Sequence, residues 1–475
     1  MPYKKLAAQM GLSFCLAIVL GFYPIGMPAS AASGKRGDPD GDGSITIADV
    51  MEVCKVMARQ SAGTLPSADL LWACDLTGDD VVAIDDVMEL CKILARGEDL
   101  PPDDSVPDVG GETSSDVSQG GGEEIYPFGQ SGETLMERIV TAYGSGDGHM
   151  VLERRGEEQP AFLWPYSTYV QATADIYKAA PDDAIRRARY MAALEGIEAY
   201  HTGRASPGRS YAASYGGAGD VYYDDNMWIV LAFVEGYYNL KDPTLLSRAR
   251  QVAEFCLSGW DEKLDGGIYW CESQKTTKNT CSNAPMAMAA VRLFEATGNI
   301  SYRRWSERIY AWTREKLRDP ADGLYYDHLD LSGGLVTRKY ACNAGCMLIA
   351  ALELYDQTDQ AAYLDDARQI AAAANDYFLQ KQGDGYTLST AGVGDPWFLT
   401  WLVEGYIGLC DWDEHVREYV DHLASATRTG LLARDGEGFV YSGWSDGVGN
   451  TADLIHQCGT VSVCMQLDAW SHGAE

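Results

Sequence analysis

NAPMAMAAVRL (residues 283–293) and SYRRWSERIYAWTREK (residues 301–316) are the two segments that decide the fold of this chain. The first is small and apolar nearly all round at helical spacing, which is typical of a helix buried on every side. The second places Arg, Glu and Lys among aromatic residues, which predicts an amphipathic helix with one face toward solvent. The same order recurs at residues 343–354 and 360–374. The chain therefore alternates inner helices with outer ones.

This alternation runs from residue 126 to residue 475. Helical periodicity, with Gly, Pro, Asp or Asn at the joins, predicts twelve helices over residues 131–143, 166–180, 182–200, 224–240, 242–258, 282–298, 300–318, 340–358, 360–378, 396–410, 412–426 and 452–470. Six inner–outer pairs predict an all-α domain folded as an (α/α)6 barrel. An α-solenoid fits the helices equally well but does not explain the loops rich in glycine and aromatic residues, such as DGGIYW at 265–270. We expect these loops to surround a cleft at one end of the barrel.

The composition and the N-terminal residues limit which cellular compartment and which partners we expect. The formal net charge is -32 and the isoelectric point about 4.5, which argues against a nucleic acid or an anionic membrane as partner. Lys4 and Lys5, then an apolar stretch, then PASAA at 28–32 predict a secretory signal peptide over residues 1–31, with Ala29-x-Ala31 as its cleavage site. No other apolar run is long enough to span a membrane. We expect a secreted protein without membrane insertion.

The cysteines follow no disulfide or metal framework. Loss of the signal peptide removes Cys15 from the 12 cysteines and leaves an odd number without regular spacing. We predict many free thiols, with a disulfide between Cys271 and Cys281 as the alternative. Cys342 and Cys346 lie four residues apart in an apolar helix, so we expect both in the core.

An acidic repeat occupies the N-terminal region. The segment DPDGDGSITIADVMEVCKVMAR at 38–59 recurs as DLTGDDVVAIDDVMELCKILAR at 75–96. Each copy follows the spacing of an EF-hand loop, whose oxygen ligands bind calcium. The predicted Ca²⁺ ligands are Asp38, Asp40, Asp42, Ser44, Thr46 and Asp49 in the first loop and Asp75, Thr77, Asp79, Val81 and Asp86 in the second. The second loop should bind more weakly, because Thr77 and Asp80 replace the usual Asp and Gly. An acidic helical hairpin without metal is the alternative.

Neither loop has a helix before it, and Asp rather than Glu closes both. In these features residues 36–97 resemble a dockerin, the module that attaches cellulosomal enzymes to cohesin domains of a scaffold protein. The resemblance implies structural calcium, a cohesin partner contacted through Ile47-Ala48 and Ile84-Asp85, and attachment to a cellulosome-like complex. Residues 98–125 are rich in Pro, Gly, Ser and acids, which predicts a disordered acidic linker.

Two adjacent carboxylates, Asp224 and Asp225, stand at the head of one predicted helix. They lie in YYDDNMW, residues 222–228, between aromatic residues and before an apolar run. Burial of two carboxylates side by side is unfavourable unless one is protonated or both have a function. Glycoside cleavage needs such a pair, because one carboxyl attacks or activates water and the other protonates the leaving oxygen. The alternative is an N-cap Asp followed by an Asp that the helix dipole favours.

Further motifs follow this pair in order. They are Gly259-Trp260-Asp261, Gly266-Gly267-Ile268-Tyr269-Trp270, Lys278-Asn279, Ser282-Asn283-Ala284-Pro285 and Asn343-Ala344-Gly345. Their order and spacing resemble glycoside hydrolase family 76, the endo-α-1,6-mannanases of bacteria and fungi, over nearly all of residues 126–475. The resemblance implies hydrolysis of the α-1,6-mannan backbone of yeasts or fungi without a catalytic cofactor. It also implies that Asp224 is the nucleophile and Asp225 the general acid/base of a retaining double displacement.

Side chains for sugar binding are expected around this pair, because aromatic rings stack on sugar faces and polar groups bind hydroxyls. The expected substrate-binding residues are Tyr223, Trp228, Trp164, Trp270, Asn279, Asp327, Asn343 and Asp446, with Trp397 and Trp444 as further stacking candidates. Each Trp has a core position as its alternative, and each lone loop Asp a turn. The histidines, among them His328 and His456, have no triad spacing with Ser or Cys, so we expect structural or surface roles for them.

Two other functions stay open. One is another (α/α)6 carbohydrate enzyme, either an inverting glucanase or an unsaturated-uronyl hydrolase. Inversion needs carboxyls about 6.5–9.5 Å apart, which adjacency disfavours, and a uronyl enzyme needs a basic cluster that these loops do not show. The other is a mannan-binding, scaffold-associated protein without catalysis, against which the intact Asp224 and Asp225 argue.

Overall fold

The computed structural model describes residues 127–144, 150–389, 395–445 and 447–473, and before them only Asp49, Val50, Val53, Lys55, Val56, Cys74, Leu76 and Leu90. The chain separates into two compact units, residues 1–119 and 120–475, and each is described by itself. In the first unit Val53 and Val56 are helical and buried and Lys55 is helical and exposed, as expected of an amphipathic helix after the first loop. Among the predicted calcium ligands, Asp49 is buried. The other ligands, the signal peptide, the linker and the expected cohesin contacts lie outside the described residues.

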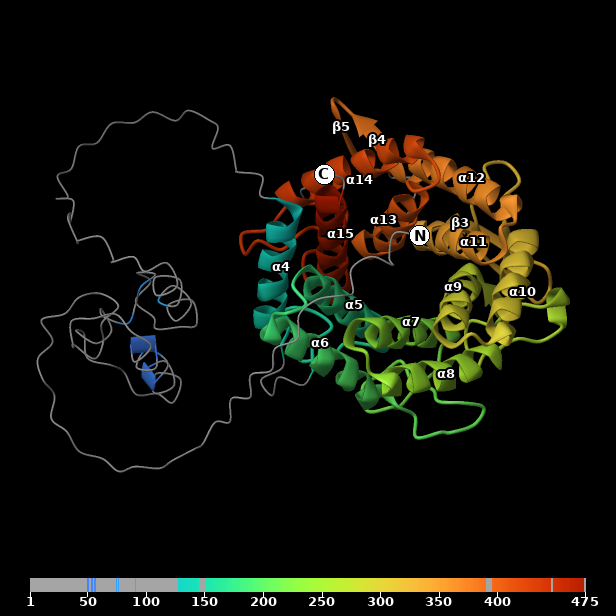
Figure 1. The fold of residues 1–475 in the computed structure, drawn as a ribbon, viewed down its shortest axis with the longest axis horizontal. Helices are drawn as coiled ribbons and strands as arrows, with labels where there is room; N and C mark the ends of the chain where they lie inside the picture. The colour runs from blue at the N-terminus through green and yellow to red at the C-terminus, as the bar shows by residue number, and fades with distance from the viewer. Residues whose placement is uncertain are drawn as a thin grey trace, which may run out of the picture. The chain divides into compact units, whose positions relative to one another are not determined.

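The second unit is built from two rings of helices (Figure 1). The inner helices are α5 (Leu163–Ala179), α7 (Tyr223–Leu240), α9 (Thr280–Thr297), α11 (Ala341–Thr358), α13 (Pro396–Leu409) and α15 (Leu454–Gly473). The outer helices are α4 (Phe128–Tyr143), α6 (Ala184–Gly196), α8 (Pro243–Leu257), α10 (Ile300–Leu317), α12 (Ala361–Phe378) and α14 (Arg417–Leu432). The inner ring closes because α15 packs against both α13 and α5. This arrangement is the predicted (α/α)6 barrel.

The inner and outer positions follow the apolar pattern that predicted them. Most side chains of α9 and α11 are buried, whereas α10 and α12 bury one face each. Small residues let the inner helices approach closely. A Cβ added at Gly345 of α11 would lie 2.6 Å from the backbone of Trp401 on α13, and one at Gly459 of α15 would lie 2.3 Å from the backbone of Trp397. The barrel interior is therefore packed rather than hollow at these levels.

Capping residues set the helix starts close to the predicted positions. Asp242 accepts a hydrogen bond from the Thr244 backbone N–H, and Asp395 accepts one from the Trp397 backbone N–H, each with a proline at the first helical position. The largest shift concerns the helix predicted over 412–426. There a 3-10 turn, η3 (Glu414–Val416), comes first, and α14 begins only at Arg417.

The loops contain short strands that the sequence-based prediction did not include. Strands β1 (Thr277–Asn279), β2 (Tyr326–Asp330) and β3 (Leu335–Lys339) form an antiparallel sheet in that order, and β4 (Leu379–Gln382) pairs with β5 (Gly385–Leu388). Two 3-10 turns, η1 (Ile197–Tyr200) and η2 (Lys263–Asp265), complete the elements. The strands arise because long loops fold back on one another and pair their backbones. The core itself is all helical, as predicted.

Ion pairs join the inner helices near the ends at which they finish. Arg292 of α9 donates from Nε to Glu353 of α11 at 2.7 Å and also pairs with Glu404 of α13. Lys178 of α5 lies 2.6 Å from the buried carboxylate of Asp175 and 2.8 Å from Glu235 of α7. In the part of the chain that the structure describes, no helix is both long and apolar enough to cross a membrane.

Candidate active site

A cleft of about 940 Å³ opens where the inner helices begin. Its size falls in the range of small-molecule and cofactor sites. First turns of the inner helices and the loops before them supply the lining, which includes Glu153, Phe162, Trp164, Tyr222, Asp224, Asp225, Trp228, Trp270, Asn279, Cys281, Asp327, His328, Tyr340, Cys342, Asn343, Asp395, Trp397, Phe398, Asp453 and His456. This lining contains no Lys or Arg among the described residues.

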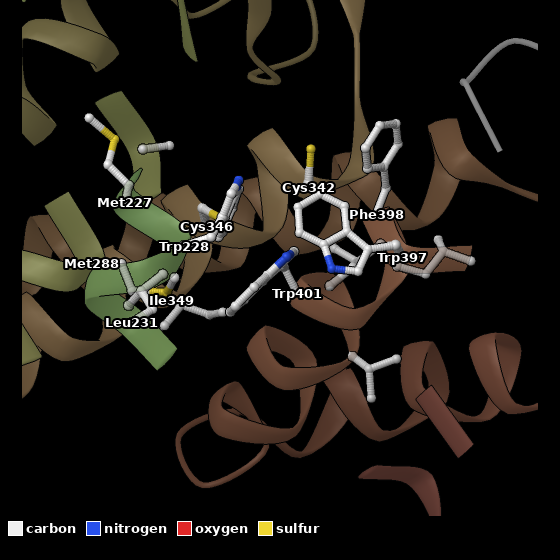
Figure 2. Close-up of a cluster of buried hydrophobic side chains, with 14 of the residues drawn as sticks. Met227, Trp228, Leu231, Met288, Cys342, Cys346, Ile349, Trp397, Phe398 and Trp401 are labelled. Atoms are coloured by element: carbon white, nitrogen blue, oxygen red, sulfur yellow. The ribbon is translucent and has the colours of Figure 1, made fainter. Parts of the chain in front are cut away.

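Aromatic rings form one wall of the cleft. Trp228 of α7 stacks on Trp401 of α13 with ring centroids 5.0 Å apart and meets Trp397 edge-on at 4.9 Å (Figure 2). Trp164 of α5 packs against Trp397 and Phe398 on the same side. Rings from three inner helices thus pack on one another beside the cleft, and Trp164, Trp228 and Trp397 are among its lining residues. Such rings offer sugar units an apolar face.

Asp224 is held by neutral hydrogen-bond donors. The indole Nε1–H of Trp270 donates to Asp224 Oδ2 at 2.9 Å, and the Cys281 thiol donates to the same oxygen at 3.2 Å. The backbone N–H of Asp225 donates to Oδ1 at 3.0 Å. Burial raises the pKa of Asp224, and these hydrogen bonds offset part of that rise. Its carboxylate is therefore kept ionisable in a fixed orientation.

Asp225 has a different environment. It follows Asp224 in the first turn of α7 and has no side-chain hydrogen bond or ion pair among the described residues. Burial, and then the charge of Asp224, raise the pKa of Asp225 well above the usual range of a carboxyl group. The two neighbours thus differ, because hydrogen bonds favour the anion of Asp224, whereas nothing offsets the rise in the pKa of Asp225.

The residues around the pair fix how α7 begins. Asn226 is buried, accepts a hydrogen bond from the Tyr211 backbone N–H and donates to the Tyr211 and Tyr222 carbonyls. Tyr223 is buried and stacks on Phe255 of α8 with ring centroids 5.0 Å apart. Residues that point into the protein before and after the pair leave Asp224 and Asp225 facing the cleft, together with Trp228 one turn later.

The predicted sugar-binding residues divide into three groups. Trp164, Trp228, Trp270, Asn279, Asp327, Asn343 and Trp397 all line the cleft. The prediction was wrong for Tyr223, which faces α8, whereas its neighbour Tyr222 lines the cleft and packs on Trp270 at 4.8 Å. For Trp444 the core alternative holds, because its ring is buried and its indole N–H donates to the Thr460 hydroxyl. Asp446 lies outside the described residues.

Cys271 and Cys281 are free thiols, so no disulfide joins them.

A second polar cluster in the cleft escaped the sequence-based prediction. His456 of α15 lies with Nδ1 3.2 Å from Asp395 and Nε2 3.4 Å from Asp453, and Arg154 approaches Asp453 at 2.6 Å. Burial lowers the pKa of His456, but the bonds to both carboxylates outweigh this effect and raise it to about 9. The sequence did not reveal this cluster, because the partners of His456 come from positions 61 and 3 residues away that the fold brings together. The Asp395-Pro396 cap was the only signal for this cluster in the sequence.

Several buried polar atoms of the cleft have no hydrogen-bond partner among the described residues. They are Trp164 Nε1, Asn279 Oδ1, Asn343 Nδ2 and Trp397 Nε1. Buried polar groups of folded proteins are nearly always paired, so each such atom requires an explanation. The residues that carry these atoms line the cleft, and polar side chains beside aromatic rings suit a ligand with many hydroxyl groups.

Comparison with protein families agrees with this site. The profile of glycosyl hydrolase family 76 matches residues 131–392, which is more than half of the chain. The chain belongs to glycosyl hydrolase family 76. The matched region of this family 76 chain includes Asp224 and Asp225 and the whole stretch from α5 to α12.

Individual relatives cover different shares of the family 76 chain. The mannan endo-1,6-alpha-mannosidase of Candida albicans is 27% identical over 175 residues, which are 34% of this chain and 39% of that protein. The chain thus spans about two-fifths of the length of this curated relative. A family 76 α-mannanase structure from Bacteroides thetaiotaomicron superposes with a TM-score of 0.67 at 20% identity over 74% of this chain and 98% of that one.

A third relative carries a substituted pair of consecutive aspartates. It is a structure of the α-1,6-mannanase of Salegentibacter sp., described as an inactive variant with both aspartates replaced by asparagine, in complex with α-1,6-mannotriose. It superposes with a TM-score of 0.62 at 23% identity over 72% of this chain and 99% of that one. At these identities the two solved structures show that the fold is shared.

Proposed function

We propose that the protein is an endo-α-1,6-mannanase that hydrolyses the α-1,6-linked backbone of yeast or fungal mannan with retention. The observation that carries the proposal is the half-buried pair Asp224–Asp225, which lines a cleft and has no cationic partner among the described residues. Membership of family 76 and the activity named for the Candida albicans relative support this substrate. The inactive double-asparagine variant from Salegentibacter supports a catalytic role for adjacent aspartates.

Asp224 acts as the nucleophile in this proposal. Its carboxylate forms a bond to the anomeric carbon while the bond from that carbon to the glycosidic oxygen breaks, which leaves a covalent glycosyl-enzyme. The donors Trp270 and Cys281 and the backbone N–H of Asp225 hold the carboxylate in place before the attack. Because the carboxylate is already oriented, less entropy is lost on the way to the transition state, and the activation free energy is lower.

Asp225 acts as the general acid and then as the base. Its raised pKa keeps the proton on the carboxyl group until the glycosidic oxygen leaves and accepts it. Water then attacks the anomeric carbon of the glycosyl-enzyme, gives a proton to Asp225 and releases Asp224 as a carboxylate. Both groups return to their starting protonation states, and two successive displacements retain the anomeric configuration.

The lining of the cleft supports a neutral glycan as substrate. Aromatic rings offer stacking to sugar faces, and the polar side chains that line the cleft, such as Asn279 and Asn343, offer hydrogen bonds to hydroxyls. A glycan that carries carboxylates would require cationic side chains, and the described lining has no Lys or Arg. This favours mannan over the uronic-acid substrates of the alternative enzyme class.

We also propose that residues 1–31 direct export and that residues 36–97 form a dockerin held by calcium. The repeated loops support this, because carboxylate, hydroxyl and carbonyl oxygens are the donors that Ca²⁺ prefers. Asp38, Asp40, Asp42 and Asp49 would supply most of the charge in the first loop. Calorimetric titration of the full chain with a dockerin-binding cohesin, with and without a calcium chelator, tests it. Binding that persists unchanged after chelation contradicts the calcium-held dockerin.

Hydrolysis of linear α-1,6-mannan by the full chain tests the catalytic proposal. Wild type should release short manno-oligosaccharides, and NMR of the first products should show the α anomer before mutarotation. An initial β anomer would indicate inversion and overturn the double displacement. Binding of mannan without any cleavage would favour the non-catalytic alternative, and cleavage of a different glycan would remove the substrate assignment while leaving the catalytic pair.

A further inference from the structure

We propose that Cys281 is a positioning residue for the nucleophile, and that its thiol determines with which oxygen Asp224 attacks. The inference rests on the proposed function, because it takes Asp224 as the nucleophile. Cys281 stands in the first turn of α9, next to the cleft, and its Sγ lies 3.2 Å from Asp224 Oδ2.

The donors around Asp224 are distributed unequally between its two oxygens. Oδ2 accepts from both the Trp270 indole at 2.9 Å and the Cys281 thiol at 3.2 Å. Oδ1 accepts from the Asp225 backbone N–H at 3.0 Å. Each carboxylate oxygen offers about two lone-pair sites. Both sites of Oδ2 are therefore filled, whereas Oδ1 keeps one free lone pair, and Oδ1 is the oxygen available to attack the anomeric carbon.

The thiol serves this purpose only as a neutral donor. Burial, then the charges of Asp224 and Asp327, then the hydrogen bond to Asp224 raise the pKa of Cys281 well above the usual range of a thiol, and the thiol of Cys342 adds to the effect. Cys281 therefore stays protonated over the pH range in which carboxylates titrate. The neutral thiol donates a hydrogen bond to Asp224, whereas a thiolate would place a second negative charge beside it.

A second thiol in the same cleft provides a matched control. Cys342 of α11 also lines the cleft, but its Sγ lies 3.8 Å from the side-chain oxygen of its neighbour Asn343. No hydrogen bond joins Cys342 to a carboxylate among the described residues. Removal of each thiol thus separates the effect of the contact with Asp224 from the effect of losing a sulfur atom in the cleft.

Infrared spectroscopy of the full chain tests the contact without any substrate. The S–H stretching band lies in a window free of other protein bands, so the difference spectrum of wild type minus Cys281→Ser isolates this thiol. We expect the band at a lower frequency than that of a free thiol, and we expect Asp224→Asn to move it upward because a neutral acceptor is weaker. The proposal is overturned if the band lies at the free-thiol frequency and does not shift in Asp224→Asn.

The pH dependence of kcat/KM on α-1,6-mannan tests the consequence. Cys281→Ala should lower kcat/KM about 10-fold and move the acid limb to higher pH, because Asp224 loses a donor that stabilises its anion. Cys281→Ser keeps a donor and should retain the wild-type acid limb. The proposal is overturned if the acid limb of the pH profile of Cys281→Ala coincides with that of wild type, or if Cys342→Ala shifts the acid limb by the same amount. If wild type does not cleave mannan, the proposed function fails, and the infrared result still decides the contact.

Discussion

Two groups of acidic side chains on the inner helices have opposite surroundings. Where α9, α11 and α13 finish, Arg292 holds Glu353 and Glu404 in a charged network. Where α7 begins, Asp224 is bound only by neutral donors, and Asp225 has no partner among the described residues. A buried charge without a counter-ion destabilises a protein strongly. A cation therefore compensates the acids of this network, and the pair without a cation is where we propose that the chemistry takes place.

Replacement of Asp225 by Asn should have the largest effect on activity. We expect kcat to fall by about 100-fold or more, since the general acid is lost, while thermal stability at pH 7 rises. The folded-state pKa of Asp225 is raised above its unfolded value, so the folded protein binds the extra proton and loses stability as pH rises from about 4 upward. Mannan hydrolysis and thermal unfolding of both proteins at pH 5 and pH 8 check this. An Asn variant that is less stable than wild type at pH 8 contradicts it.

Loss of Arg292 should have the next largest effect, and it should act on stability alone. Arg292→Met leaves Glu353 and Glu404 without their cation, which should lower the unfolding free energy by about 2–4 kcal/mol for these partly exposed groups. Burial raises the pKa of Glu353 to about 7 even beside Arg292, and loss of the cation should raise it further, so the stability loss should grow as pH rises from about 6 to about 8. Denaturant unfolding at both ends of this range measures it. Adding Glu353→Gln to the variant should restore part of the stability.

His456 should give a further pH-dependent effect on stability. Its folded-state pKa is raised to about 9, so its stabilising charge is fully present below about 6.5 and is lost as pH rises through 9. Wild type should therefore lose roughly 2–3 kcal/mol of stability between pH 6 and pH 10 that His456→Gln does not lose. Thermal unfolding of both proteins at the two pH values gives the comparison. Parallel pH profiles would show that Asp395 and Asp453 do not hold a charged ring.

Trp270 and Tyr223 provide the smallest and most selective contrast. Trp270→Phe removes the indole donor from Asp224 and should lower kcat/KM about 10-fold with little change in stability. Tyr223→Phe alters a side chain that faces α8 rather than the cleft and should change kcat/KM less than about twofold. Steady-state kinetics on the same mannan checks both. Equal losses in the two variants would place Tyr223 in substrate binding after all.

Much of the fold and part of the site were predictable because they depend on local patterns. Residues 283–293 are apolar nearly all round, and they form an inner helix for that reason. The adjacent carboxylates at the head of α7 are visible in any reading of residues 222–228. The tyrosine beside them was assigned to the wrong side, because the direction of a side chain at the first turn depends on the packing of Phe255 and Asn226 rather than on its own neighbours in sequence.

The sequence by itself determined the alternation of helices, the close packing of their inner ring and the presence of two neighbouring acids, since each depends on residues within a few turns of chain. Only the tertiary structure decided which acids are paired. Arg292 reaches Glu353 and Glu404 across 61 and 112 residues, and His456 reaches Asp395 across 61. The same holds for Cys281, which meets Asp224 across 57 residues. Hydrogen bonds and counter-ions act over a few ångströms in space, and the closed ring of helices is what brings these distant positions within that reach.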